Sequence, residues 1–206
     1  MTKGYFYKIF DEDNVFYSSS SDTLFIVPNH AGGMDFNDLR NKAWNAYDKA
    51  IEMLKKGDIR DSVEKAWLAI ENMRKAIMVA ARVPYDIVRK ISVTLNIFNG
   101  ILKALNAETL LEKYYYFQAT LHGLSFYEGI LNEDVTIDAI LKVEEWLKDA
   151  EKIIEKAKNI DARPLVDIEI KRRKIQSEIL SKARELIEIR KERASMIEKL
   201  RKTGVE

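Results

Sequence analysis

GDIRDSVEKAWLAIENMRKAIMVAA, residues 57–81, is the clearest indication of fold class in the chain. Gly57 is suited to end one helix and Asp58 to begin the next, because an aspartate side chain accepts hydrogen bonds from the free amides of a first helical turn. Apolar residues then recur at every third or fourth position: Val63, Ala66, Trp67, Ile70, Met73, Ile77 and Met78. This spacing predicts an amphipathic helix from Ile59 to about Arg82, with one face in a core.

The same helical period continues on both sides of this stretch. Asp35 is suited to cap a helix that runs to about Lys56, with Leu39, Ala43, Ala46, Tyr47, Ala50 and Leu54 on one face. Further helices are predicted from Pro84 to about Leu105 and over residues 107–131, 134–159 and 164–202. We therefore predict an all-α, up-and-down helical bundle over residues 37–160.

The first 36 residues have a different composition. Aromatic and β-branched runs, YFYKIF and VFYSS, flank DEDN, which is typical of a hairpin turn. We predict a small β-rich or irregular N-terminal arm over residues 1–36.

The last predicted helix is unusually long and basic. It has no internal proline or glycine and would span roughly 60 Å, more than a compact bundle of this size. Between Arg163 and Gly204 there are 13 Lys and Arg against 7 Asp and Glu, although the whole chain carries only +1. We treat residues 161–206 as a separate amphipathic segment. Part of it should project, fold back, or pack on a second subunit, and we expect a homodimer.

Composition excludes several classes of site. The 206 residues include no cysteine, so disulfides, thiol nucleophiles and cysteine-bound zinc are excluded. No His-Glu-x-x-His or Gly-x-Ser-x-Gly motif is present, and we predict neither a metal nor a cofactor. No apolar run reaches the roughly 18 residues of a membrane helix, and the N-terminus does not have the pattern of a signal peptide. We therefore expect a cytoplasmic protein without membrane contact.

Two segments resemble known helical families. The first, Gly57 to Ala81, resembles the second helix of HEPN domains (higher eukaryote and prokaryote nucleotide-binding), with Glu64, Lys65, Ala66, Lys75 and Ala76 at the matching positions. The second, ATLHGLSFYEGIL at residues 119–131, is similar to the archaeal PaREP family, a HEPN-like group, although one extra residue separates His122 from Phe126. Together the two segments cover roughly residues 38–158.

The resemblance implies a helical bundle, often dimeric. Many HEPN proteins are metal-independent ribonucleases, commonly toxins paired with a small nucleotidyltransferase, and their motif is an arginine followed after four to six residues by a histidine. With His122 as that histidine, the arginine would stand at position 115, 116 or 117, which hold two tyrosines and a phenylalanine. The motif is absent at its known spacing, and we lean against an enzyme.

His122 is therefore open to three interpretations: a packed histidine, a ligand contact in a noncatalytic pocket, or a general base. On an α-helix it would share a face with Tyr115 and Gln118. The predicted ligand-binding or groove residues are Tyr115, Gln118, His122, Tyr127 and Glu128, with His122 the candidate catalytic residue.

Three functions follow from these observations. The first is a noncatalytic HEPN-like interaction or nucleotide-binding module, in a toxin–antitoxin or defence-type system. The second is a metal-independent ribonuclease with a diverged site at His122. The third is nucleic-acid binding by the last helix, in which Lys171, Arg172, Arg173 and Lys174 would contact phosphates. Interleaved glutamates in that helix equally suit an ordinary solvated face.

Overall fold

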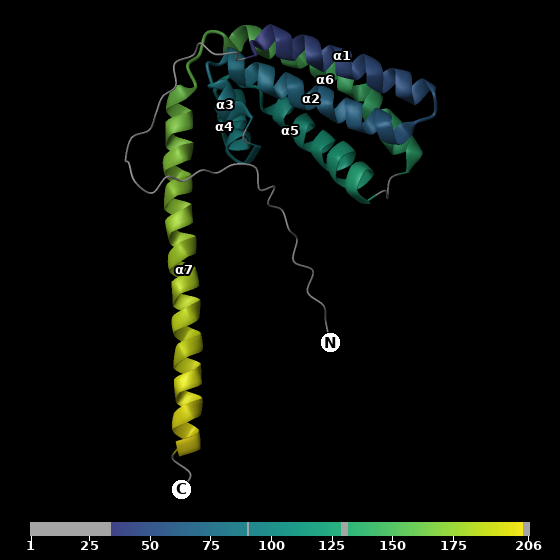
Figure 1. Cartoon of the computed structure of the whole chain (residues 1–206). Helices are drawn as coiled ribbons and strands as arrows, with labels where there is room; N and C mark the ends of the chain where they lie inside the picture. The colour runs from purple at the N-terminus through teal and green to yellow at the C-terminus, as the bar shows by residue number, and fades with distance from the viewer. Residues whose placement is uncertain (1–33, 90, 129–131, 204–206) are drawn as a thin grey trace. The chain divides into compact units, whose positions relative to one another are not determined.

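A computed structural model describes residues 34–89, 91–128 and 132–203 of the chain. Every regular element in these ranges is a helix, so the prediction of an all-α bundle is confirmed (Figure 1). The elements are α1 (Phe36–Lys55), α2 (Ile59–Ala80), α3 (Tyr85–Val88), α4 (Ile91–Ala104), α5 (Glu108–Phe117), η1 (Gln118–Glu128), α6 (Glu133–Ala157) and α7 (Arg163–Thr203). The predicted β-rich arm, apart from its last three residues, lies outside the described residues.

The two predicted aspartate caps begin α1 and α2. The Asp35 carboxylate accepts a hydrogen bond of 2.8 Å from the Asp38 amide, and Asp58 accepts one of 3.1 Å from the Asp61 amide. Gly57 separates the two helices with a φ of +79°, a conformation that residues with a side chain rarely adopt. The turn is therefore tight, and α1 and α2 pack against each other along their lengths (Figure 1).

The core lies between α1, α2 and α6, and α5 and η1 close it on the other side of α2. Its largest member is Trp146 of α6, which is fully buried and donates a hydrogen bond of 3.0 Å from Nε1 to the Leu110 carbonyl. The Ser62 hydroxyl donates to the Ala50 carbonyl at 2.8 Å and so links α2 to α1 inside the core. Buried polar atoms are thus used to join neighbouring helices.

Two predicted helices are divided in the structure. The segment predicted as one helix from Pro84 to about Leu105 forms the short α3 and then α4. The segment predicted as one α-helix over residues 107–131 is α-helical only to Phe117, and from Gln118 to Glu128 it is a π-helix, η1. Hydrogen bonds in a π-helix reach the fifth residue rather than the fourth, so each turn is wider and the faces of the helix shift.

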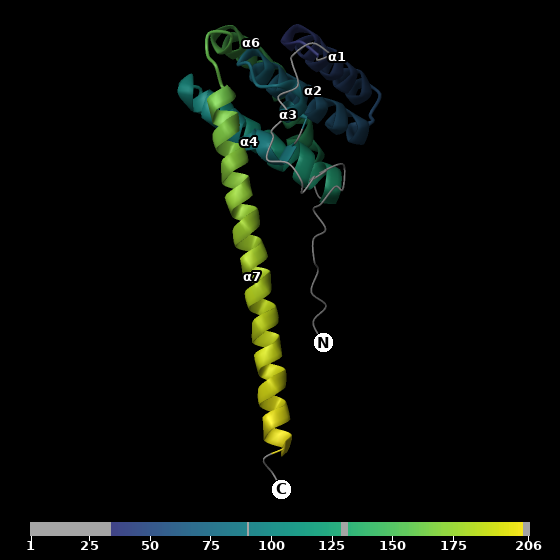
Figure 2. The same cartoon turned by 60° about the vertical axis from the view of Figure 1, so that its left-hand side comes forward.

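The long predicted C-terminal helix is confirmed as α7, which is one continuous helix in both views (Figures 1 and 2). Its first turns are anchored to the bundle. The Ala162 amide donates a hydrogen bond of 2.9 Å to the Ala81 carbonyl at the end of α2, and Leu165 packs against Gly100 of α4. From Lys174 to Arg201 every side chain is exposed.

Candidate functional site

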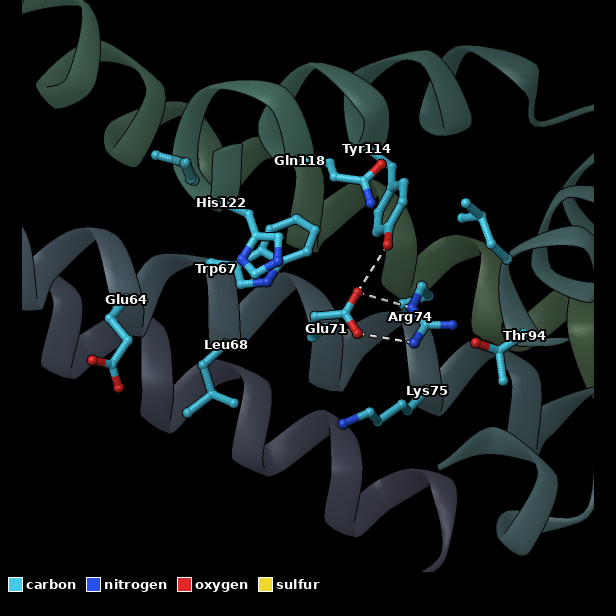
Figure 3. Close-up of a pocket in the computed structure, with 12 residues that line it drawn as sticks. Glu64, Trp67, Leu68, Glu71, Arg74, Lys75, Thr94, Tyr114, Gln118 and His122 are labelled. Atoms are coloured by element: carbon cyan, nitrogen blue, oxygen red, sulfur yellow. Dashed lines mark hydrogen bonds and ion pairs between the residues drawn. The ribbon is translucent and has the colours of Figure 1, made fainter. Parts of the chain in front are cut away.

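A pocket of about 420 Å³ opens beside α2, between α4, α5 and η1 (Figure 3). Its volume falls in the range of about 300–1,000 Å³ that is usual for small-molecule sites. Helix α2 supplies half of the wall, because residues three or four apart lie on one face of a helix. The lining residues are Glu64, Trp67, Leu68, Glu71, Arg74, Lys75, Thr94, Leu95, Tyr114, Gln118, Leu121 and His122.

One wall of the pocket is a stacked pair of rings. The imidazole of His122 lies parallel to the indole of Trp67, with ring centroids 5.0 Å apart and an interplanar angle of 16°. Figure 3 shows the two rings overlapping at the η1 side of the pocket. The Tyr114 ring also contacts Trp67, at a centroid distance of 5.7 Å. The wall is therefore aromatic, and such a surface can stack on a planar ligand.

The inner end of the pocket holds a buried ion pair. Oxygen Oε1 of Glu71 accepts hydrogen bonds from Arg74 Nε and from the Tyr114 hydroxyl, and Oε2 accepts from Arg74 Nη2, all at 2.9 Å (Figure 3). The Arg74 side chain is only 2% exposed. Burial by itself acts to raise the pKa of Glu71, but the Arg74 charge and these hydrogen bonds outweigh it and lower that pKa. Glu71 is therefore ionised at neutral pH.

Arg74 and Tyr114 are held in their protonated forms by the same contacts. Burial acts to lower the pKa of Arg74, but the Glu71 carboxylate outweighs it and raises that pKa. The pKa of the Tyr114 hydroxyl is raised by burial and then by the Glu71 charge. The guanidinium is thus committed to Glu71 in a bidentate pair, and it is a structural cation rather than one aimed at a ligand.

Lys75 is the second cation of the pocket and differs from Arg74. It is half-buried, and no hydrogen bond or ion pair joins its amine to any residue in the described ranges. Burial lowers the pKa of Lys75, with Arg74 and Arg89 adding to the effect and Glu71 opposing it. A half-buried ammonium gains most from an anionic partner, because burial has already removed part of its hydration.

The imidazole of His122 is held in its neutral form. Burial lowers the pKa of His122 below its ordinary value of 6.5, and the Glu71 charge only partly opposes this. At neutral pH the ring is therefore uncharged, which suits stacking on Trp67. A neutral imidazole also has one nitrogen that can accept a proton or a hydrogen bond.

The predicted site residues divide into three groups. Gln118 and His122 both line the pocket. Tyr115 is 40% exposed and is not a lining residue; its neighbour Tyr114 is. The change of neighbour has a physical reason: the widened turns of η1 rotate His122 away from the face of Tyr115. The side chains of Tyr127 and Glu128 lie outside those that the structure describes.

The sequence did not reveal that Arg74 reaches this pocket. No arginine stands at the ribonuclease spacing before His122. A distant arginine such as Arg74 or Arg89 could reach His122 only through the fold, and the linear spacing gives no reason to look 48 positions upstream. The usable signal was local: Glu71 and Arg74 are three residues apart, the spacing of a helical ion pair, on a helix whose other face is apolar.

The predicted basic cluster lies apart from the pocket, early in α7. Lys171, Arg172 and Lys174 are exposed, and Arg173 is half-buried. Arg172 is paired with Glu169 at 2.9 Å. Two further ion pairs of this kind lie along the exposed part of α7, Lys182–Glu185 at 3.0 Å and Lys191–Glu188 at 2.7 Å. Its positive charge is thus partly compensated on the helix itself.

A family model for the archaeal PaREP1/PaREP8 family matches residues 38–147. This is more than half of the chain and includes every residue that lines the pocket. The chain belongs to the archaeal PaREP1/PaREP8 family. Within it, the PaREP region comprises α1 to η1 and the first half of α6, whereas α7 lies beyond the match.

No curated protein and no solved structure matches the chain. The resemblance to HEPN domains therefore stays a prediction, while membership in the PaREP family is confirmed. No helix in the described ranges is long and apolar enough to span a lipid bilayer. Among the same residues, no group of His, Asp and Glu is arranged to hold a metal ion.

Proposed function

We propose that this PaREP protein is a noncatalytic binding module whose pocket takes a small, planar anion of the mononucleotide class. One observation carries the proposal: an aromatic wall and a half-buried lysine meet in one pocket whose other cation is already neutralised. The base would lie against the Trp67–His122 wall, and the phosphate would pair with Lys75. As predicted from the resemblance to HEPN domains, such a module would serve in a toxin–antitoxin or defence-type system, with a protein partner such as a nucleotidyltransferase.

The charge distribution supports an anionic ligand at one end only. Glu71 and Arg74 cancel each other, and Glu64, at the other end of the α2 stripe, pairs with Lys65 at 3.1 Å. Lys75 therefore contributes the uncompensated charge of the wall. The apolar side chains of Leu68, Leu95 and Leu121 fill the rest of it, which suits the flat face of a base better than a sugar chain.

The test is a titration with adenosine 5′-monophosphate and uridine 5′-monophosphate, followed by tryptophan fluorescence and by calorimetry. Stacking on Trp67 should quench part of the emission, and a Trp44→Phe variant, which removes an indole on α1, should keep that quenching. Lys75→Gln should weaken binding about 10- to 100-fold, because a hydrogen bond to a charged group contributes about 1.5–3 kcal/mol. Trp67→Leu should weaken it to a similar degree.

Arg60→Gln is the matched control, because Arg60 is an exposed cation on the same helix that does not line the pocket. The affinity of this variant should equal that of the unmodified protein. Equal weakening by the Arg60 and Lys75 variants would show a general charge effect and reject the site. No quenching and no heat at millimolar nucleotide would reject the ligand class.

A second candidate function is supported by the neutral state of His122. A metal-independent ribonuclease needs a proton acceptor and a cation at the phosphate, and His122 and Lys75 line the same pocket. In this alternative Lys75, rather than Arg74, would replace the missing motif arginine.

Labelled single-stranded RNA incubated with the pure protein in EDTA separates the two candidates. Cleavage that disappears in both His122→Ala and Lys75→Gln would establish the ribonuclease. Intact RNA together with mononucleotide binding would establish the noncatalytic module. Cleavage that survives both substitutions would come from a contaminant.

A further inference from the structure

The exposed part of α7 carries an apolar seam that two cations, Lys182 and Arg193, interrupt. Between Ile175 and Leu200, positions alternately three and four residues apart hold six large apolar side chains, each between 50% and 66% exposed. In heptad notation, Ile175, Lys182, Ile189 and Met196 occupy position d, and Ile179, Leu186, Arg193 and Leu200 occupy position a. A 3–4 spacing sustained over nearly four heptads is the pattern of a coiled coil. No described residue of the bundle covers this seam.

We propose that α7 pairs with α7 of a second copy of this chain as a parallel, in-register, two-stranded coiled coil. The exposed apolar surface is the first reason. Apolar side chains that are scattered singly are normal on a protein surface, whereas a contiguous stripe of this length marks an interaction site. A second copy fits it because the seam is complementary to itself: layers of Ile, Leu and Met meet the same layers of the partner.

The charged flanks select the parallel orientation. Glu178, Glu185 and Glu192 all fall at position g, on one edge of the seam. An antiparallel pair would place these g positions against one another, glutamate facing glutamate. A parallel pair instead places each g beside the e position five residues further on in the other chain, so Glu185 meets Arg190 twice by symmetry. In this arrangement Glu178 and Glu192 face the uncharged Ala183 and Ile197, and the attractive pair is Glu185 with Arg190.

The two cations inside the seam select two strands. Leu186 at position a and Ile189 at position d would by themselves favour three or four strands. Lys182 and Arg193, however, would then be enclosed, and burying an ion without a partner costs several kcal/mol. In a two-stranded seam long basic side chains reach the edge. Lys182 already does so, since its Nζ lies 3.0 Å from Glu185 Oε2, and Arg193 would reach Glu192 of the partner helix.

Nucleic acid is the competing occupant of α7. The basic cluster from Lys171 to Lys174, however, precedes the seam, and the seam itself is apolar with an acidic edge. Phosphate binding would use the basic cluster and would leave the apolar seam uncovered. The two possibilities also respond differently to salt, because a protein that neutralises several phosphates loses affinity steeply as salt rises, whereas apolar burial does not.

Cysteine cross-linking tests the register directly, because the natural chain contains no cysteine. Leu186→Cys places a thiol at position a, where identical residues of a parallel in-register pair face each other. Arg184→Cys places one at position f on the outer face and is the matched control. Under mild oxidation of the full-length protein, Leu186→Cys should form a disulfide-linked dimer at least about tenfold faster, because bridging requires closely spaced Cα atoms. Equal rates at the two positions, or no dimer from Leu186→Cys, would overturn the proposal.

Light scattering gives an independent readout. The unmodified chain should elute with about twice its 23.9 kDa mass, at both low and high salt and after nuclease treatment. Leu186→Asp should give single chains, while Arg184→Asp should stay dimeric, with circular dichroism confirming that the bundle remains helical in both. A single-chain mass for the unmodified protein, three or more chains, or association that nuclease or high salt abolishes would each overturn the proposal.

Discussion

In the pocket, a guanidinium that is 2% exposed pairs with a carboxylate that also accepts a hydrogen bond from a tyrosine hydroxyl. Along α7 from Lys174 onward, by contrast, isoleucines and leucines are exposed, as are the lysines beside them. The first region encloses charge and satisfies it within one chain. The second leaves apolar surface unsatisfied within one chain. The difference indicates that the bundle is stabilised by its own contacts, and that the stability of α7 depends on what covers it.

The largest expected effect comes from breaking the enclosed ion pair. Arg74→Ala should lower the free energy of unfolding by about 3–5 kcal/mol, because Glu71 would remain buried without its counter-charge. Lys113→Ala, which removes an exposed pair with Glu145, should cost at most about 1 kcal/mol. Urea denaturation followed by circular dichroism measures both. Equal losses would mean that Arg74 is far better solvated than its burial indicates.

A pair of leucine truncations sharpens the comparison. Leu121 is fully buried in the pocket wall, whereas Leu180 is 60% exposed on α7, outside the a and d positions. Leu121→Ala should cost about 2–5 kcal/mol through lost burial and the cavity left behind. Leu180→Ala should change the free energy of unfolding by no more than about 0.5 kcal/mol. A large loss from Leu180→Ala, measured by the same denaturation, would mean that this face of α7 is covered.

Two adjacent tyrosines test the hydrogen bond to Glu71. Tyr114→Phe removes only the hydroxyl that donates to Glu71 Oε1, and it should cost about 1.5–3 kcal/mol because the acceptor is charged. Tyr115→Phe removes a hydroxyl from a 40% exposed side chain and should be neutral within about 0.5 kcal/mol. Thermal and urea unfolding of the two variants at neutral pH provide the comparison.

The smallest effect concerns pH. Burial lowers the pKa of His122 in the folded state, so on acidification the unfolded chain takes up this proton first. The neutral ring therefore favours folding above about pH 6.5, and stability should decline as the pH falls below that value. His122→Gln should reduce this decline between pH 7 and about pH 5.5, while His30→Gln serves as the comparison for the other histidine. Glu71, whose lowered pKa places its titration below the ordinary value of 4.5, acts in a separate, more acidic range.

Local signals in the sequence predicted the helices well. The caps at Asp35 and Asp58, the apolar stripes of α1 and α2, and the uninterrupted α7 all depend on neighbours within a few residues, which a single sequence displays. The pocket depends on more. The conversion of α5 into η1 at Gln118 follows no glycine or proline, and it exchanges Tyr115 for Tyr114 beside His122.

The identity of the pocket's cations was equally out of reach. Arg74 and Lys75 are adjacent in sequence and chemically alike, yet one is bound by Glu71 and the other is not. The spacing of three residues from Glu71 to Arg74 and that of four residues from Glu71 to Lys75 both suit a helical ion pair. The Tyr114 hydroxyl, which donates to the same carboxylate, comes from 43 positions away. Periodicity identifies the face of α2 on which both lie, but only packing decides which charge is neutralised.

Helix α4 touches both the pocket and the anchored start of α7: Thr94 and Leu95 line the pocket, while Asn96 and Gly100 contact Glu169 and Leu165. The two events proposed for this chain, occupation of the pocket and pairing of α7, therefore share one element. Thermodynamics makes any influence between them mutual. If the pairing of α7 changes the affinity of the pocket by some factor, filling the pocket must change the α7 pairing constant by the same factor. Where the two events are coupled, a titration of either one also measures the other.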